Sequence, residues 1–248
     1  EILPNYLYRN GVDVVWRSTN WGEPPLHIEH IYNLAALKER YPEANGNYDG
    51  ILLEGLKEEI EGCEAHKVLI VLHTSTSHGP EYYAKYPEEF TKFTPVCTTV
   101  EMAKAELSEL INAYDNTILY TDYLLNTMID SLNTQNAHAA VWYVSDHGQT
   151  ITSTQGWHGT GSKDEYHVPL YIWFSESYKN NNPTIIKQLQ KQTHTPINSD
   201  NIFYTICGMT HIQLPLEYAH PTWDISSTEF VVHPRQMLLG NQIINLDE

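Results

Sequence analysis

Residues 140–148 read AVWYVSDHG, an apolar run followed at once by Ser-Asp-His-Gly. The run is rich in β-branched and aromatic side chains, which predicts a strand from Ala140 to Val144. In open α/β sheets, ligands bind at the carboxyl ends of the strands. These four residues therefore stand where a binding site is expected.

Three further apolar runs predict strands, and helical patterns separate them. The near-continuous apolarity of two runs, Val68–Leu72 and Ala140–Val144, suits strands that are covered on both faces, as in a parallel sheet. We therefore expect an α/β fold with a mostly parallel central sheet sandwiched by helices. The other predicted strands are Val12–Trp16 and Val168–Phe174, and the predicted helices are Ile51–Gly62, about 100–132 and about Asp200–Cys207.

The helix at about 100–132 has two signals. Thr98 and Glu101 have the spacing of a capping box, and apolar residues recur at helical spacing after them. Two segments with glycine or proline, Ser18–Leu26 and Thr150–Tyr166, are expected to be loops.

The composition excludes some partners. The chain has 31 acidic and 14 basic residues, a formal net charge of −17, so nucleic acid is an unfavourable partner. The charge also leaves the attraction of a phosphate group to a metal or to local donors. Neither a long apolar run nor a signal peptide occurs. Because the chain begins with Glu1, we interpret it as a processed or excised single domain, 1–248.

The Asp146–His147 pair is the first candidate metal site. An Asp oxygen and a His nitrogen are both good zinc ligands, and Gly148 gives the turn conformational freedom. The alternative is an Asp that caps a turn beside a surface histidine. His158 lies eleven residues after His147 in a glycine-flanked loop that can fold back toward the strand end.

A second polar cluster, His73-Thr-Ser-Thr-Ser-His78-Gly-Pro80, follows the strand Val68–Leu72. A polar turn explains its hydroxyl groups well but explains its two histidines poorly. If the two strands are neighbours, the clusters meet at one edge of the sheet, as in a metal or phosphate site. After the first strand, Arg17 and Asn20 are candidate donors to phosphate oxygens, although such a turn is more often structural.

Together these motifs resemble the lipid A phosphoethanolamine transferases. The resemblance runs from about residue 5 to about residue 210, and FTPVC at 93–97 and NAYDN at 112–116 also contribute to it. It implies an alkaline-phosphatase-like or sulfatase-like catalytic domain at the periplasmic face of the bacterial inner membrane. It also implies an N-terminal bundle of membrane helices upstream of such a domain.

The resemblance further implies a reaction. A zinc-bound threonine takes phosphoethanolamine from phosphatidylethanolamine and passes it to lipid A or to another glycan or protein acceptor. Residue by residue, Asp146 and His147 match the zinc-binding pair. His78 and His158 match two histidines that bind a second zinc or the substrate phosphate, His73 matches a histidine near the substrate pocket, and Asn20 matches a donor near the phosphoethanolamine.

Several positions depart from the family pattern. The zinc-binding Glu and the nucleophilic Thr of the family lie upstream of the Val12 strand, and no residue here matches either, which we interpret as a truncation that leaves the fragment inactive. Gln149 stands where the family usually has Glu, and the expected lysine after Asn20 has no match. Cys97 is either unpaired or joined to Cys63.

Two other classes of function stay open at this stage. A soluble sulfatase or phosphodiesterase of the same superfamily would share the Asp-His metal pair but would hydrolyse its substrate. A non-enzymatic metal-binding or scaffold domain would explain the missing nucleophile, but it would not explain five potential site residues at two strand ends.

Overall fold

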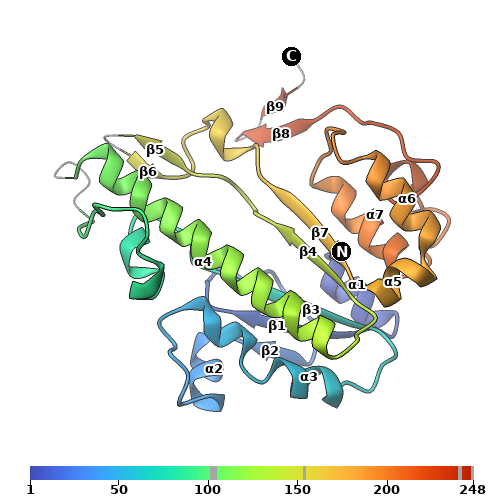
Figure 1. Cartoon of the computed structure of the whole chain (residues 1–248). Helices are drawn as coiled ribbons and strands as arrows, with labels where there is room; N and C mark the ends of the chain where they lie inside the picture. Colours follow the sequence, from blue (N-terminus) through green and yellow to red (C-terminus); the bar gives the residue numbers. More distant parts are fainter. Residues whose placement is uncertain (101–104, 153–154, 240–241, 247–248) are drawn as a thin grey trace. The chain divides into compact units, whose positions relative to one another are not determined.

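The computed structural model describes residues 1–100, 105–152, 155–239 and 242–246 (Figure 1). The chain divides into two compact units. The larger comprises Val14–Glu64 and Ile70–Ser175, and the smaller comprises Glu1–Asp13, Ala65–Leu69 and Glu176–Glu248.

The larger unit holds the strands and the longest helix. Its strands are β1 (Asp13–Ser18), β2 (His30–Tyr32), β3 (Val68–His73), β4 (Ala140–Val144), β5 (Thr150–Thr152), β6 (Gln155–Trp157) and β7 (Leu170–Phe174), of which β1 and β3 begin in the smaller unit. Its helices are α2 (Leu34–Arg40), α3 (Leu56–Gly62) and α4 (Leu107–Thr134), with short 3-10 turns η1 (Asp49–Leu53), η2 (Tyr82–Ala84), η3 (Glu88–Phe90) and η5 (Lys163–Glu165).

The smaller unit is mainly helical. It contains α1 (Leu3–Arg9), α5 (Glu176–Asn181), α6 (Pro183–Lys191), α7 (Asp200–Met209), η6 (Pro221–Trp223) and the hairpin of β8 (Gln236–Leu239) and β9 (Gln242–Asn245). The predicted helix at Asp200–Cys207 is thus confirmed within two residues. In the part of the chain that is described, no helix combines the length and the apolarity that a membrane crossing requires.

The strands of the larger unit form two main groups. One is a three-stranded sheet in the order β2-β1-β3, in which β1 and β2 are parallel. The other pairs β4 with β7, and this pair is antiparallel, with Ala140 opposite Phe174. Val14 and Val15 of β1 are fully buried, as expected for a strand covered on both faces. The α/β fold is confirmed, with an antiparallel pair that the apolar runs did not reveal.

Helix α4 packs on η2, η3 and β5. Leu110 and Ala113 on its buried side form a core with Tyr82, and partly buried side chains from the flanking segments extend this core. The helix starts at Leu107, later than predicted, because Glu106 and Glu109 form a reciprocal capping box there. Thr98 lies outside the helix, and Glu101 lies outside the described residues.

Three other predicted boundaries were wrong. The helix expected at Ile51–Gly62 is divided, because Gly55 adopts a left-handed conformation (φ +57°) between η1 and α3. The loop expected at Thr150–Tyr166 contains the β5–β6 hairpin and η5. Strand β7 begins at Leu170, after Pro169, which has no N–H to donate to a ladder. No disulfide joins Cys63 to Cys97, both of which are described.

Candidate metal and phosphate site

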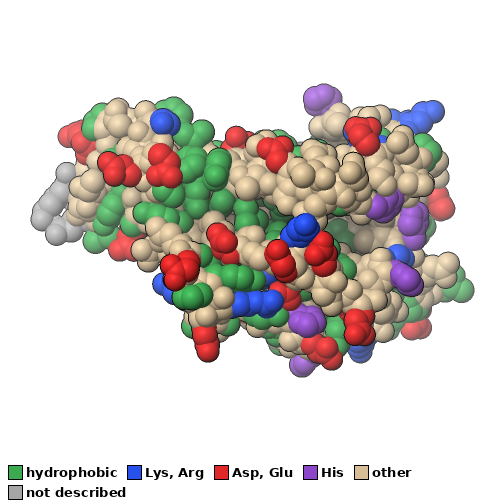
Figure 2. Space-filling model, turned by 60° about the horizontal axis from the view of Figure 1, so that its bottom comes forward, with side chains coloured by type: hydrophobic (Ala, Val, Ile, Leu, Met, Phe, Trp, Pro, Cys, Tyr) green, Lys and Arg blue, Asp and Glu red, His purple; other side chains and the backbone are tan. Residues whose placement is uncertain are grey.

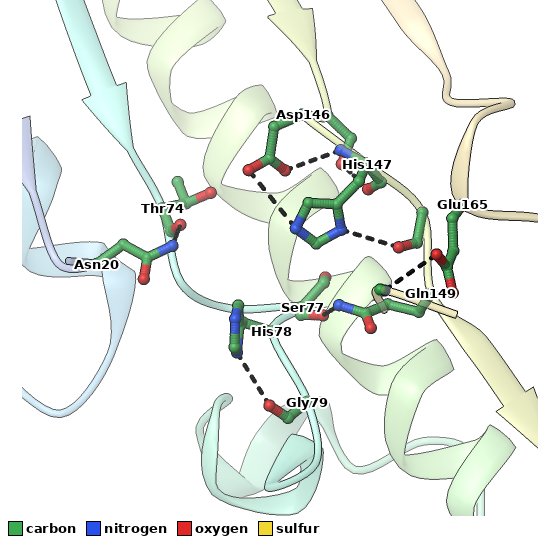
Figure 3. Close-up of polar contacts among 12 residues, drawn as sticks. Asn20, Thr74, Ser77, His78, Gly79, Asp146, His147, Gln149 and Glu165 are labelled. Atoms are coloured by element: carbon green, nitrogen blue, oxygen red, sulfur yellow. Dashed lines mark hydrogen bonds and ion pairs between the residues drawn. The ribbon is translucent and has the colours of Figure 1, made fainter. Parts of the chain in front are cut away.

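The turn after β4 presents Asp146 and His147 side by side (Figure 3). The Asp146 Oδ1 atom accepts a hydrogen bond from the His147 backbone N–H at 2.9 Å, and the Asp146 Oδ2 atom lies 3.7 Å from the His147 Nε2 atom. His147 Nδ1 lies 2.9 Å from the Gly148 carbonyl oxygen, which can only accept. Nδ1 therefore carries the proton, and the Nε2 lone pair remains available to a metal.

Gly148 is required for a reason other than flexible dihedral angles. A Cβ atom at this position would lie 2.0 Å from the Asp164 backbone oxygen. The turn after β4 therefore runs directly against η5, and the Gly148 N–H donates to the Glu165 carbonyl at 2.8 Å. The position of the Asp146–His147 pair consequently depends on the segment that contains Glu165.

Three histidines from separate segments converge. The rings of His147 and His158 have centroids 3.8 Å apart, and the rings of His158 and His78 have centroids 5.1 Å apart. His78 Nδ1 lies 2.9 Å from the Gly79 carbonyl oxygen, so its Nε2 atom also keeps an available lone pair. Of the segments that the sequence predicted to converge, 73–78, 146–147 and 158, the structure thus brings together His78, His147 and His158.

The His158 side chain is partly buried. Its Nδ1 atom is buried and has no hydrogen-bond partner. Burial lowers the pKa of His158, the neighbouring His147 and His78 lower it further, and Asp146 and Glu165 partly oppose this shift. A buried imidazole nitrogen without a partner is suited to bind a ligand atom, because it gains a bond that the protein alone leaves unmade.

His73 and Asn20 lie at the ends of β3 and β1. His73 Nδ1 is 3.0 Å from the Ser18 hydroxyl oxygen, and its ring contacts Trp16 edge-on. The Asn20 amide donates to the Thr74 carbonyl at 3.2 Å. These contacts fix both residues at the β1–β3 strand ends, and they do not join either one to the three-histidine cluster.

Arg17 is excluded as a phosphate ligand. Its side chain is fully buried, donates to the Leu52 carbonyl at 3.0 Å and lies 3.2 Å from a Glu59 carboxylate oxygen. Arg40 lies 2.8 Å from the same carboxylate. Arg17 is therefore part of the core beneath β1, where it joins the strand to α3.

Two buried carboxylates that the sequence did not single out hold the histidine loops. Asp49 accepts from the backbone N–H groups of Ser75 and Thr76, both at 2.8 Å, in the loop between His73 and His78. Glu165 accepts from the loop that follows His158. Neither belongs to a motif in the sequence: Asp49 stands between Tyr48 and Gly50, and Glu165 stands between Asp164 and Tyr166.

Gln149 links the two polar clusters. Its amide nitrogen lies 3.4 Å from the Ser77 carbonyl oxygen, and its own buried oxygen has no partner (Figure 3). A glutamate here could not donate to Ser77. The amide therefore supports the approach of the 73–78 loop to the turn after β4.

The residues present fit a zinc ion, the metal that the resemblance implies. Two ligands at bond lengths of about 2.0–2.1 Å around a tetrahedral zinc lie about 3.4 Å apart. The Asp146 and His147 ligand atoms are 3.7 Å apart, close to that separation. Within the described residues, no group of three or more His, Cys, Asp and Glu side chains is arranged to hold a metal. The pair would therefore supply only part of a coordination shell.

Comparisons with known proteins agree with this fold. A model of the Sulfatase family matches residues 1–212. The chain belongs to the sulfatase family. It is 35% identical over 216 residues to the phosphoethanolamine transferase EptA of Helicobacter pylori, covering 84% of this chain and 40% of that protein. The chain thus spans about 40% of the length of this relative and of phosphoethanolamine transferase EptA of Escherichia coli.

Solved structures of this sulfatase-family type are also similar. The C-terminal periplasmic domain of phosphoethanolamine transferase EptC from Campylobacter jejuni superposes with a TM-score of 0.77 at 29% identity, over 92% of this chain and 71% of that one. The corresponding domain of EcEptC from Escherichia coli, crystallised in complex with Zn, has a TM-score of 0.72 at 22% identity, over 100% and 72%. The second likeness concerns the fold alone. The sulfatase-like fold predicted from the sequence is confirmed.

Proposed function

We propose that this chain belongs to the catalytic domain of a zinc-dependent phosphoethanolamine transferase. The enzyme acts at the periplasmic face of a bacterial inner membrane. The observation that carries the proposal is the convergence of His78, His147 and His158 beside Asp146. Relatives named phosphoethanolamine transferases, among them a periplasmic domain, support the reaction and the compartment. The donor is phosphatidylethanolamine, and the acceptor is lipid A or another glycan or protein.

Asp146 Oδ2 and His147 Nε2 are the atoms that would hold the zinc. When bound, zinc would supply positive charge and would lower the pKa of a neighbouring hydroxyl group. The family resemblance assigns that hydroxyl to a threonine that no residue of this chain matches, and the reaction would pass through a phosphothreonine.

The other residues act on the phosphoryl group and on the leaving group. Phosphoryl transfer depends on positioning and on charge stabilisation of the equatorial oxygens. His78 and His158 would bind those oxygens, and Asn20 would donate to the phosphoethanolamine. His73, at the end of β3, would supply a proton to the departing group.

Substitution of the metal pair tests this proposal. In the intact enzyme that contains this chain, we expect His147→Ala to abolish transfer of phosphoethanolamine from a fluorescent phosphatidylethanolamine to lipid A, because the metal is lost. Zinc content, measured by mass spectrometry, should fall in parallel. A matched control is His194→Ala, which removes an exposed histidine and should leave both values unchanged.

Two outcomes would contradict the proposal. Unchanged turnover in His147→Ala would remove the Asp146–His147 pair from the metal role. Release of free phosphoethanolamine into water without modification of any acceptor would favour a hydrolase of the same family.

A further inference from the structure

Glu165 contacts the backbone of both loops that carry the closest pair of histidines. Its side chain is buried, with 3% of its surface exposed. One carboxylate oxygen accepts from the N–H groups of Gly159 at 3.0 Å, Thr160 at 3.1 Å and Gly161 at 3.3 Å. The other accepts from the hydroxyl groups of Thr150 at 2.7 Å and Thr160 at 2.6 Å.

Three successive N–H groups that point at one oxygen form a concave anion site of the kind that binds phosphates in other proteins. Gly159 and Gly161 both adopt positive φ angles, +86° and +79°, which bring these N–H groups to the same side. Here the chain fills the site with its own carboxylate. Hydrogen bonds to an ionised acceptor are about twice as strong as those between neutral groups, so the loop is held firmly.

The backbone of Glu165 reaches the other histidine. Its carbonyl oxygen accepts from the Gly148 N–H at 2.8 Å, directly after His147. Its carboxylate holds Gly159, directly after His158. One residue therefore fixes the relative position of the His147 and His158 rings, which have centroids 3.8 Å apart.

We propose that Glu165 is a positioning residue, which holds the His158 loop against the Asp146–His147 turn so that the metal pair and the phosphate-binding histidine keep their spacing. This inference rests on the proposed function, because it assigns Glu165 a role only through those histidines. Glu165 itself touches neither the metal nor the substrate.

Truncation and conservative replacement of Glu165 test the inference. We expect Glu165→Ala in the intact enzyme to accelerate amide hydrogen exchange at residues 159–161 at least tenfold. It should also weaken binding of cobalt(II), used as a spectroscopic probe for zinc, about tenfold and alter its visible absorption bands. Glu165→Gln should restore hydrogen exchange and cobalt binding most of the way to their wild-type values. Its amide oxygen can still accept from the three N–H groups, and the threonine hydroxyl groups can turn to accept from its NH₂ group.

The matched control is Asp224→Ala in the smaller unit. It removes a partly buried carboxyl group that accepts a hydrogen bond from the Ser226 backbone N–H at 2.8 Å. It should leave exchange at 159–161 and the cobalt spectrum unchanged. If Glu165→Ala does not fold, Thr160→Ala replaces it in the test. This variant loses one hydrogen bond to the Glu165 carboxylate, and it should change hydrogen exchange and cobalt binding in the same direction by a smaller factor.

The outcomes separate the two proposals. Wild-type exchange at 159–161, or wild-type cobalt affinity and spectrum, in Glu165→Ala would overturn the positioning role while the metal site stands. Cobalt binding that His147→Ala fails to weaken would overturn the metal site itself, and the role of Glu165 with it. A lower melting temperature with an unchanged cobalt spectrum would show that Glu165 is only structural.

Discussion

At the scale of single residues, the ionisation of Glu165 makes the stability of the fold depend on pH in the acid range. Burial by itself raises the pKa of this carboxyl group, but hydrogen bonds from Thr160, Thr150 and the Gly159 backbone outweigh it and lower the pKa from 4.5 to about 2. A lowered pKa means that the folded state holds this proton less tightly than the unfolded chain does. The stabilisation is therefore complete above about pH 4.5 and is lost as the pH falls toward 2.

We predict that the melting temperature of Glu165→Gln changes less between pH 5 and pH 2.5 than that of the wild-type chain. The variant lacks the titrating group, so its stability carries no contribution from this proton. Thermal denaturation followed by circular dichroism at half-unit pH steps measures the difference. Parallel curves for the two proteins over this range would contradict the assigned pKa.

Gly148 offers a steric test of the turn after β4. Gly148→Ala should destabilise the fold by about 2 kcal/mol or more, because the new Cβ would lie 2.0 Å from a backbone oxygen that cannot rotate away. Urea denaturation gives the free energy of unfolding. Gly62→Ala is the control, since a Cβ at that position in α3 meets no atom within 4 Å. An equal effect of both substitutions would show that the turn can relax.

Histidines and carboxylates differ in how well sequence reveals them. His78, His147 and His158 stand out because each follows or flanks a glycine-containing turn near a strand end. Asp49 and Glu165 are buried and bind loop backbone, yet nothing in the sequence sets them apart from the other acidic residues of an acidic chain. Their roles depend on contacts across 26 and 5 residues respectively, which no local pattern encodes.

At the scale of elements, α4 carries a buried amide that orders the segment before it. The Asn116 side chain is fully buried, accepts from the N–H groups of Lys92 and Phe93 at 2.9 Å, and donates to the Phe93 carbonyl at 3.0 Å. This single side chain binds backbone groups of the irregular segment at 91–95, which follows η3. The segment is thereby fixed to the helix without secondary structure of its own.

Asn116→Ala should therefore lower the free energy of unfolding by about 2–4 kcal/mol, because it removes a buried side chain and its three hydrogen bonds to Lys92 and Phe93. Asn126→Ala, an exposed position on the same helix, should change it by less than about 0.5 kcal/mol. Chemical denaturation of the two variants side by side measures both values. A cost below 1 kcal/mol for Asn116→Ala would mean that water replaces the amide.

Strands and helices differ in how far the sequence predicts them. The ranges of β3 and β4 follow from uninterrupted apolar runs, whose ends coincide with the first polar residue. The antiparallel pairing of β4 with β7 cannot be predicted from the sequence. Both strands are apolar at most positions, so a parallel and an antiparallel arrangement would bury similar side chains. The start of α4 was missed because Glu106 is an uncommon N-cap and acts only together with Glu109.

At the scale of the whole molecule, repulsion among acidic side chains is the dominant electrostatic effect. The net charge is −17, and acidic side chains are spread over the face shown in Figure 2. Exposed ion pairs such as Lys57–Glu61, with 3.8 Å between their charged atoms, contribute less than about 1 kcal/mol each. Repulsion among the unpaired carboxylates therefore outweighs these attractions.

We predict that raising NaCl from 10 to 150 mM at pH 7.5, with a chelator present, stabilises the chain by about 1 kcal/mol, a rise of about 2–4 °C in melting temperature. The screening length falls from about 30 Å to about 8 Å over this range, which removes most of the long-range repulsion and leaves contacts at hydrogen-bond distance almost intact. At pH 5, close to the isoelectric point of about 5.1, the effect of salt should nearly vanish. A melting temperature that falls with salt at pH 7.5 would mean that specific ion pairs, rather than net repulsion, govern the charge energetics of the fold.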